Sequence, residues 1–149
     1  MLRNLMKSPN TDNFTVPVRP RLLLVEDNEF LAEATADFLR GTGLEVRIAE
    51  TGREALTLID EFRPEIVLCD LNLPDMSGVD VARALQKNPA SKNVVFVIHT
   101  ALMETDFEGA RVPGVDLFLS KPIDEEKIAK ILSLKAHTFE DGGSGGDAP

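Results

Sequence analysis

Ile66-Val67-Leu68-Cys69-Asp70 is a run of four apolar residues that stops at a carboxylate. Arg21-Leu22-Leu23-Leu24-Val25 stops in the same way, at Glu26-Asp27. Short apolar runs of this kind are typical of strands that are buried on both faces of a sheet. The segments 45–49, 94–98 and 115–119 are further strand candidates, which makes five predicted strands.

Helix-period segments separate these strands. Apolar residues from Leu31 to Leu39 have helical spacing, and Gly41 and Gly43 are expected to end that helix. Further helices are predicted to begin at Thr51 (capping-box spacing with Glu54) and at the N-caps Ser77 and Asp124, and a short one to cover 102–111. Five strand–helix units in succession predict an α/β fold, a doubly wound parallel sheet with helices on both faces.

One domain accounts for most of the 149 residues. Residues 1–20 contain three prolines and are expected to form a flexible arm, and the glycine-rich residues 137–149 a flexible tail. The predicted folded domain therefore spans residues 21–136. No further domain is expected after it in this sequence, so the protein is expected to act by itself through protein contacts or in a relay.

Composition and charge exclude several classes of function. The net charge of −9 disfavours binding to nucleic acid, because phosphates repel an acidic surface. No apolar run approaches the roughly 20 residues that span a bilayer, and the first residues do not resemble a signal peptide. We therefore expect a cytoplasmic protein that binds neither membrane nor nucleic acid. The single Cys69 is expected to be a reduced thiol in the core.

Polar residues lie at the ends of the first, third, fourth and fifth predicted strands. In a doubly wound sheet the carboxyl ends of the strands form the ligand site. Five side chains that are distant in sequence are therefore expected to meet at one edge of the sheet, namely those of Glu26, Asp27, Asp70, Thr100 and Lys121.

Such a cluster suits phosphoryl chemistry. Three neighbouring carboxylates repel one another unless protons or a cation relieve the repulsion, and Mg²⁺ prefers carboxylate, phosphate and water oxygens. An aspartate can also attack phosphorus as a nucleophile and form an acyl phosphate. Lys121 and Thr100 offer an ammonium and a hydroxyl to stabilise the developing charge.

The ordered set of motifs resembles the response-regulator receiver family of two-component signalling. These motifs are Glu26-Asp27, Asp70 with Leu73-Pro74-Asp75-Met76-Ser77-Gly78, Thr100-Ala101 and Lys121-Pro122. The resemblance covers about residues 21–136. It implies strand order 2-1-3-4-5, and it implies that a phosphohistidine of a sensor kinase or of a phosphotransfer domain supplies the phosphoryl group.

The resemblance also implies a role for individual residues. Asp70 would accept the phosphoryl group, and Lys121 and Thr100 would contact its oxygens. Mg²⁺ would be bound by Asp27, Asp70 and the backbone carbonyl of Asn72, and by Glu26 through a water. Phe118 lies at the position of the family's switch aromatic, and the bond before Pro122 is expected to be cis.

The phosphorylation signal is expected to be passed on through a protein-binding surface. The resemblance implies that a downstream protein binds the face formed by the fourth helix, fifth strand and fifth helix, and that two copies can pair through this region. Leu102 departs from the family pattern, because a polar residue at this position could orient the attacking water. We therefore expect slow loss of the phosphoryl group.

Each of these residues, taken singly, could have a purely structural role. Glu26 and Asp27 could only cap a helix, Asp70 could only start a turn, and Phe118 could be ordinary core. His99 is expected to be a hydrogen-bonded histidine at a strand end. Together, however, the strand-end residues favour a site over these readings.

Three alternative functions remain at this point. A haloacid-dehalogenase-type phosphatase also uses a strand-end aspartate, but it needs a second aspartate where this chain has Asn72. A flavodoxin-like module would need a phosphate-binding loop in place of Glu26-Asp27-Asn28-Glu29, which would repel phosphate. A pseudo-receiver would fold alike but never be phosphorylated, and the complete acidic set argues against it.

Overall fold

The strands form one parallel sheet at the centre of the molecule, in the order β3-β2-β4-β5-β6. The structure is a computed structural model and describes residues 19–107 and 109–145. Numbered along the chain, this order is 2-1-3-4-5, which confirms the predicted fold. The strands are β2 (Arg21–Val25), β3 (Glu45–Ala49), β4 (Ile66–Asp70), β5 (Val95–Thr100) and β6 (Leu117–Ser120).

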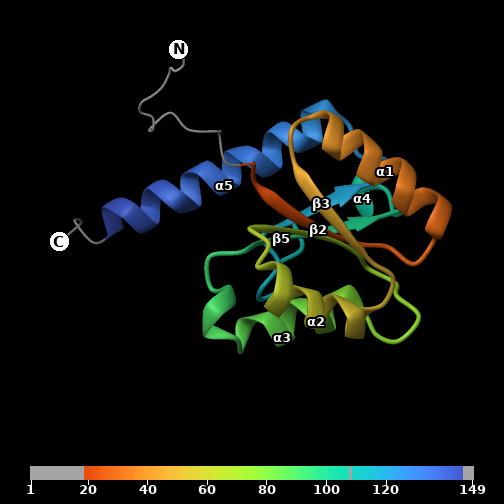
Figure 1. Ribbon diagram of the computed structural model, residues 1–149, viewed down its shortest axis with the longest axis horizontal. Helices are drawn as coiled ribbons and strands as arrows, with labels where there is room; N and C mark the ends of the chain where they lie inside the picture. The colour runs from red at the N-terminus through yellow and green to blue at the C-terminus, as the bar shows by residue number, and fades with distance from the viewer. Residues whose placement is uncertain (1–18, 108, 146–149) are drawn as a thin grey trace, which may run out of the picture.

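Helices cover both faces of the sheet (Figure 1). One face packs on α1 (Glu29–Gly41) and α5 (Glu125–Gly145), and the other on α2 (Gly52–Phe62) and α3 (Gly78–Gln86). In β2, Leu22 and Leu24 belong to the first apolar cluster, whereas Leu23 and Val25 belong to the second. Because successive side chains point to opposite faces, a strand with apolar residues at every position is buried on both.

Capping residues set the helix ends. The side chains of Asn28, Thr51 and Ser77 accept hydrogen bonds from the first-turn amides of α1, α2 and α3. Ser77 and Asp80 form a reciprocal capping box, and Arg63 ends α2 in the left-handed conformation just before Pro64. The caps end the polar loops that follow β2, β3 and β4 at the carboxyl edge of the sheet.

The elements after β5 differ most from the sequence-based boundaries. The segment predicted as a helix over 102–111 contains only α4 (Glu104–Phe107), and β6 is shorter than 115–119 suggested. Gly109 and Gly114 have positive φ angles of 80° and 88°, which interrupt regular structure there. A 3₁₀ turn, η1 (Pro89–Ser91), precedes β5.

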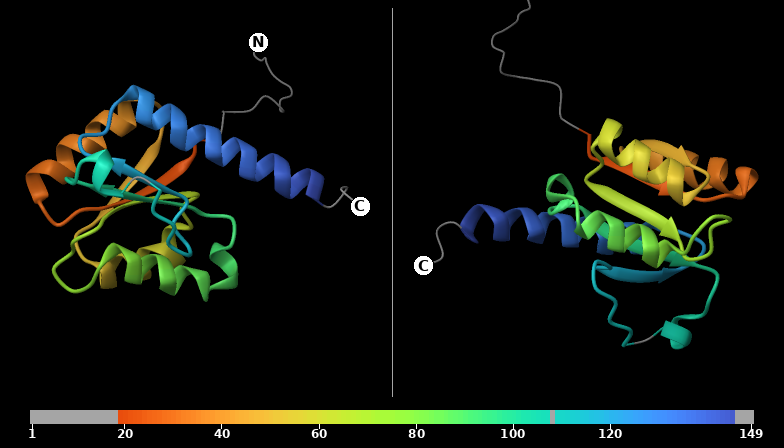
Figure 2. Two further views of the ribbon diagram at one scale, coloured as in Figure 1. Left: turned by 180° about the vertical axis from the view of Figure 1, so that it is seen from behind. Right: turned by 90° about the horizontal axis from the view of Figure 1, so that it is seen from below.

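The last helix is longer than expected. α5 continues past residue 136 to Gly145 and extends beyond the body of the sheet, as both views in Figure 2 show. It therefore covers most of the segment for which the sequence predicts a flexible tail, and residues 146–149 lie outside the described residues. Most of the predicted N-terminal arm, 1–18, also lies outside them. Among the described helices, none is both long and apolar enough to cross a bilayer.

Candidate functional site

Asp70 lies at the centre of the carboxyl edge of the sheet. It is the last residue of β4, which is hydrogen-bonded to β2 on one side and to β5 on the other. The register pairs Cys69 with Val25, and Asp70 itself with His99. The loop after β2 and the end of β5 therefore flank the Asp70 carboxylate.

Three carboxylates gather at this edge. Oxygens of Glu26, Asp27 and Asp70 all lie within 4.8 Å of one another. Glu26 is buried, Asp70 is half-buried and Asp27 is exposed, so the cluster opens to solvent on the Asp27 side. Such closely spaced negative charges need a neighbouring cation.

Lys121 supplies one positive charge within the cluster. Its Nζ donates to Glu26 Oε1 at 2.6 Å and to Asp70 Oδ2 at 3.1 Å. Burial alone lowers the pKa of Lys121, but the hydrogen bonds and charges of Glu26 and Asp70 outweigh it and raise the pKa above its usual value. Lys121 is therefore a firmly protonated ammonium. The peptide bond between Lys121 and Pro122 is cis.

Thr100 is the last residue of β5, the strand next to the one that carries Asp70. It is buried, and its Oγ1 accepts a hydrogen bond from the Leu102 amide at 3.3 Å. Its carbonyl oxygen accepts from the Lys121 amide at 2.6 Å, which ties the end of β5 to the residue that carries the ammonium. The five strand-end residues singled out in the sequence thus lie on four neighbouring strand ends.

Comparison with known proteins decides the family. The profile of the response regulator receiver domain matches residues 22–133. This chain belongs to the response regulator receiver family. The polar-differentiation response regulator DivK of Brucella anthropi is 34% identical over 112 residues, which are 74% of this chain and 91% of DivK.

Two further relatives differ in how much of their own length this chain matches. The DNA-binding response regulator MtrA of Mycobacterium tuberculosis is 38% identical over 83% of this chain, but the match covers 54% of MtrA. The chain thus spans about half the length of that relative. The response regulator TrrA of Thermotoga maritima, solved in complex with Mg²⁺ and BeF, is 26% identical with a TM-score of 0.68, over 77% of this chain and 98% of TrrA.

The loop after Asp70 is tightly structured in this receiver. The Asn72 amide donates to Asp70 Oδ1 at 3.3 Å, and the Gly78 amide donates to the Leu71 carbonyl at 2.7 Å. A Cβ at position 78 would collide with the Asp70 carbonyl oxygen and touch Ile98. Glycine at this position therefore lets α3 begin directly against the phosphoacceptor candidate.

Asp75 is a residue whose contacts the sequence did not predict. Its two carboxylate oxygens accept from the amides of Gly52 and Arg53, at 2.8 and 2.9 Å. These backbone hydrogen bonds lower the pKa of the Asp75 carboxyl. The loop after Asp70 is thus fastened to the N-terminus of α2, where a negative charge is favourable. An acidic residue in a loop is too common a signal to indicate this contact.

His99 differs from the expectation of a hydrogen-bonded histidine. It is buried on the α1 and α5 face, and its Nε2 has no hydrogen-bond partner among the described residues. Burial, followed by the positive charges of Lys121 and Lys127, lowers its pKa to about 4. The nearby Lys127 ammonium is directed instead to the carbonyls of Ser120 and Pro122. His99 is consequently neutral near pH 7.

Cys69 and Phe118 lie behind the site. Burial, with the charges of Asp70 and Glu26, raises the pKa of the Cys69 thiol, so the group is protonated. Phe118 is half-buried and packs against the cluster under α2 and α3. Its ring also stacks on Phe107.

Proposed function

We propose that this receiver accepts a phosphoryl group on Asp70 from a phosphohistidine of a sensor kinase or a phosphotransfer domain. The single observation that carries the proposal is the position of the Asp70 carboxylate. One of its oxygens lies 3.1 Å from the Lys121 ammonium, and its carboxylate shares a cluster with Glu26 and Asp27. A nucleophile, a cation and an acidic metal-binding set therefore lie together in one cluster that opens to solvent at Asp27.

The acidic set suits Mg²⁺. Ligand oxygens of an octahedral Mg²⁺ lie about 3 Å (adjacent) to 4.2 Å (opposite) apart, and the oxygens of this cluster lie within 4.8 Å of one another, which is close enough for them to serve one ion directly or through a water. Asp27, Asp70 and the Asn72 backbone carbonyl would hold the ion, with Glu26 contributing through a water. When bound, Mg²⁺ would neutralise charge on the incoming phosphoryl group. Asp27 is the exposed member of the set and offers the path of entry.

The transfer itself uses groups of this chain. A carboxylate oxygen of Asp70 attacks phosphorus, the P–N bond to the donor imidazole breaks, and its electron pair stays on the imidazole nitrogen. Lys121, already within hydrogen-bond distance of Asp70, would pair with the transferred oxygens. Thr100 would give up its role as acceptor for the Leu102 amide and donate its hydroxyl to a phosphoryl oxygen.

The consequence for output is a change of surface. Movement of Thr100 would pull the segment after β5 toward the site and change the packing of Phe118. The surface formed by α4, β6 and α5 would then differ between the two states, which is a population shift between two packings. We expect a downstream protein to bind there, and two copies of the receiver can pair through the same region.

Two alternatives make different predictions. An aspartyl phosphatase would turn over a phosphate ester steadily, and the residue two positions after its nucleophile would donate a proton, which Asn72 cannot do. A pseudo-receiver would bind partners without any phosphorylation. Neither accounts as well for Glu26, Asp27, Asp70 and Lys121 lying in one cluster.

Labelling with small phosphodonors tests the proposal. The wild-type chain is incubated with acetyl phosphate and Mg²⁺, and its intact mass is measured alongside Asp70→Asn. The matched control is Asp37→Asn, because Asp37 is an exposed aspartate on α1 that does not belong to the acidic cluster. We expect Mg²⁺-dependent labelling of the wild type and of the control only. Equal labelling of Asp70→Asn would refute the assignment, and sustained release of phosphate would favour the phosphatase.

A further inference from the structure

The segment between β5 and β6 buries few side chains, although Asp116 at its end exchanges hydrogen bonds of 2.8 Å with the Phe96 backbone. None of the residues 101–103, 105–107 and 109–116 is buried. The one helix among the described residues of this segment, α4, has four residues, and a helix this short is not stable by itself in water. The position of α4 must therefore depend on contacts with the sheet.

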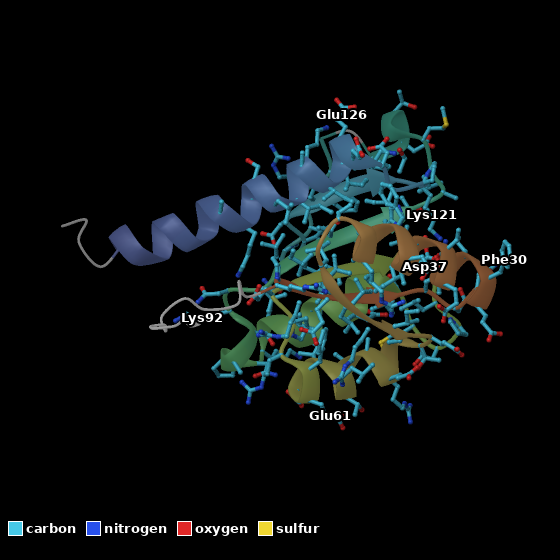
Figure 3. The ribbon with its side chains drawn as sticks, turned by 45° about the horizontal axis from the view of Figure 1, so that its top comes forward. Phe30, Asp37, Glu61, Lys92, Lys121 and Glu126 are labelled. Atoms are coloured by element: carbon cyan, nitrogen blue, oxygen red, sulfur yellow. The ribbon has the colours of Figure 1, made fainter. Side chains whose placement is uncertain are left out.

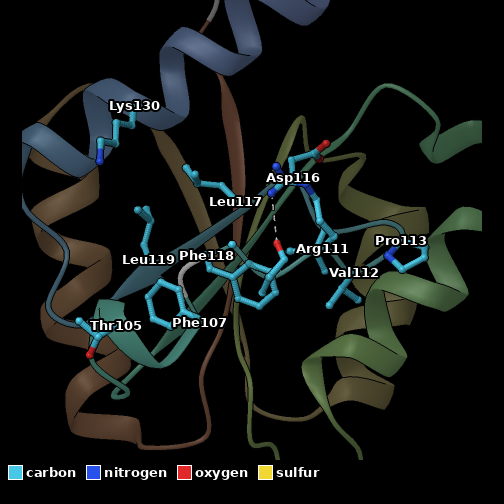
Figure 4. Close-up of a pocket in the computed structure, with 13 residues that line it drawn as sticks. Thr105, Phe107, Arg111, Val112, Pro113, Asp116, Leu117, Phe118, Leu119 and Lys130 are labelled. Atoms are coloured by element: carbon cyan, nitrogen blue, oxygen red, sulfur yellow. Dashed lines mark hydrogen bonds between the residues drawn. The ribbon is translucent and has the colours of Figure 1, made fainter.

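One aromatic pair provides such a contact. Phe107, the last residue of α4, stacks on Phe118 of β6 with ring centroids 5.7 Å apart and ring planes at 26°. Aromatic pairs at about 4.5–7 Å attract each other beyond the burial of their area. Both rings are half-buried, and Figure 4 shows them side by side in the pocket beside β6.

The pocket leaves the pair unconfined on one side. It has a volume of about 910 Å³, and its lining includes Phe107, Phe118, Val112, Val115 and Lys130. Tightly packed cores hold a ring in one rotamer because no space is available for another. Here the Phe118 ring is restrained by the cluster under α2 and α3 and by the stack with Phe107, and open space lies beside the pair.

The two ends of the same segment meet at the phosphoacceptor site. Thr100 directly precedes the segment, Lys121 directly follows β6, and the Lys121 amide donates to the Thr100 carbonyl at 2.6 Å. Phe118 lies three residues before Lys121, and its register partner Ile98 lies two residues before Thr100. Only residues 101–103 separate Thr100 from α4, so a displacement of Thr100 would reach the Phe107 ring along a short stretch of chain.

We propose that Phe107 is a positioning residue that holds Phe118 and α4 in the unphosphorylated arrangement, and that charging Asp70 separates the two rings and releases α4. The inference rests on the proposed phosphorylation of Asp70 and names the contact through which it is regulated. Because the stack stabilises only the uncharged state, its loss must favour the charged state by the same factor.

Beryllofluoride with Mg²⁺, a phosphoryl mimic, tests this in the full chain. Phe107→Leu keeps an apolar side chain but removes the stack, and Phe38→Leu on α1 is the matched control. We expect Phe107→Leu to bind beryllofluoride roughly two- to tenfold more tightly than the wild type. Hydrogen exchange should show faster exchange of α4 amides in this variant before beryllofluoride is added, and in the wild type only afterwards.

The outcomes separate this inference from the proposed function. If the wild type binds beryllofluoride but Phe107→Leu has unchanged affinity and unchanged α4 exchange, the positioning role is wrong and the phosphoacceptor role stands. If the wild type does not bind beryllofluoride at all, the phosphoacceptor role fails first. Phe118→Leu removes the same stack by changing its other ring. In the double variant the two effects on affinity should not add, whereas independent structural roles would give additive effects.

Discussion

Lys121 and Glu26, separated by 95 residues in the chain, are joined by a hydrogen bond of 2.6 Å between Nζ and Oε1. The Glu26 side chain is only 5% exposed, so its carboxylate depends on this ammonium and on the Asn28 amide for hydrogen bonds. A buried charge that loses its partner is strongly destabilising. The pair therefore links the stability of the fold to the chemistry of the site.

Lys121→Met should lower the free energy of unfolding by roughly 2–3 kcal/mol, because Glu26 is left buried without its cation. It should also abolish labelling by acetyl phosphate. Urea unfolding measures the first effect, with the exposed Lys130→Met as control. The double variant Glu26→Gln/Lys121→Met should recover much of the lost stability; if it does not, the Glu26 charge is not the cause.

Gly78→Ala should destabilise the receiver by about 1–3 kcal/mol and slow labelling, because the new methyl group collides with the Asp70 carbonyl oxygen. Gly41→Ala is the matched control, since a Cβ there meets nothing within 4 Å. Thermal unfolding and labelling rates of both variants are compared with the wild type. A Gly78→Ala chain as stable and as reactive as Gly41→Ala would contradict the close approach.

His99 should make the receiver sensitive to acid. Its pKa is about 4 in the folded state and 6.5 in the unfolded chain, so the unfolded chain binds more protons between these values. Stability that is present above pH 6.5 is therefore lost as the pH falls to 4, by up to about 3 kcal/mol.

His99→Leu isolates this contribution from that of the carboxylates, which also titrate in acid. Urea unfolding of the variant and of the wild type is measured at pH 7 and pH 5. The wild type should lose more stability than the variant between the two pH values. Parallel losses would mean that His99 is protonated in the folded state or is solvated.

Phe30 should contribute to docking of a protein phosphodonor. It is 86% exposed in the first turn of α1, two residues after the Asn28 cap, and Figure 3 shows it projecting from this end of the helix. A donor that places its phosphohistidine on Asp70 must cover the surface around the carboxyl edge of the sheet, and exposed aromatics often anchor interfaces. Phe30→Ser should slow transfer from a phosphorylated phosphotransfer domain about tenfold.

Labelling of Phe30→Ser by acetyl phosphate should not change, because a small donor needs no docking surface. Phe38→Ser on the same helix is the control for loss of an exposed aromatic. If both substitutions slow transfer equally, or if Phe30→Ser also slows labelling by acetyl phosphate, Phe30 does not belong to the docking surface.

Leu102→Asn should shorten the lifetime of the phosphorylated receiver several-fold. Leu102 is 44% exposed just after Thr100, and an apolar side chain there cannot orient an attacking water. The decay of labelled protein in the presence of Mg²⁺ measures this for both chains. A wild-type lifetime of seconds would contradict the expectation of slow loss.

Much of the fold and of the site's membership could be predicted from local sequence. Apolar runs such as Ile66–Cys69 end at polar residues, and parallel strands bring their carboxyl ends to one edge. Glu26, Asp27 and Asp70 could therefore be grouped before any coordinates were known, and their oxygens do lie together. The position of each residue along its strand was sufficient for this.

Only the tertiary structure decided which atoms touch. Three features depend on the directions of side chains from elements that are distant in sequence. Lys121 donates to both Glu26 and Asp70, Asp75 accepts from the first amides of α2, and His99 Nε2 has no hydrogen-bond partner among the described residues. The length of α4 was also not predicted: the helix ends at Phe107, and Gly109 shortly after it has a positive φ of 80°. Local patterns determine which strand end a residue occupies, whereas long-range packing determines what its side chain meets there.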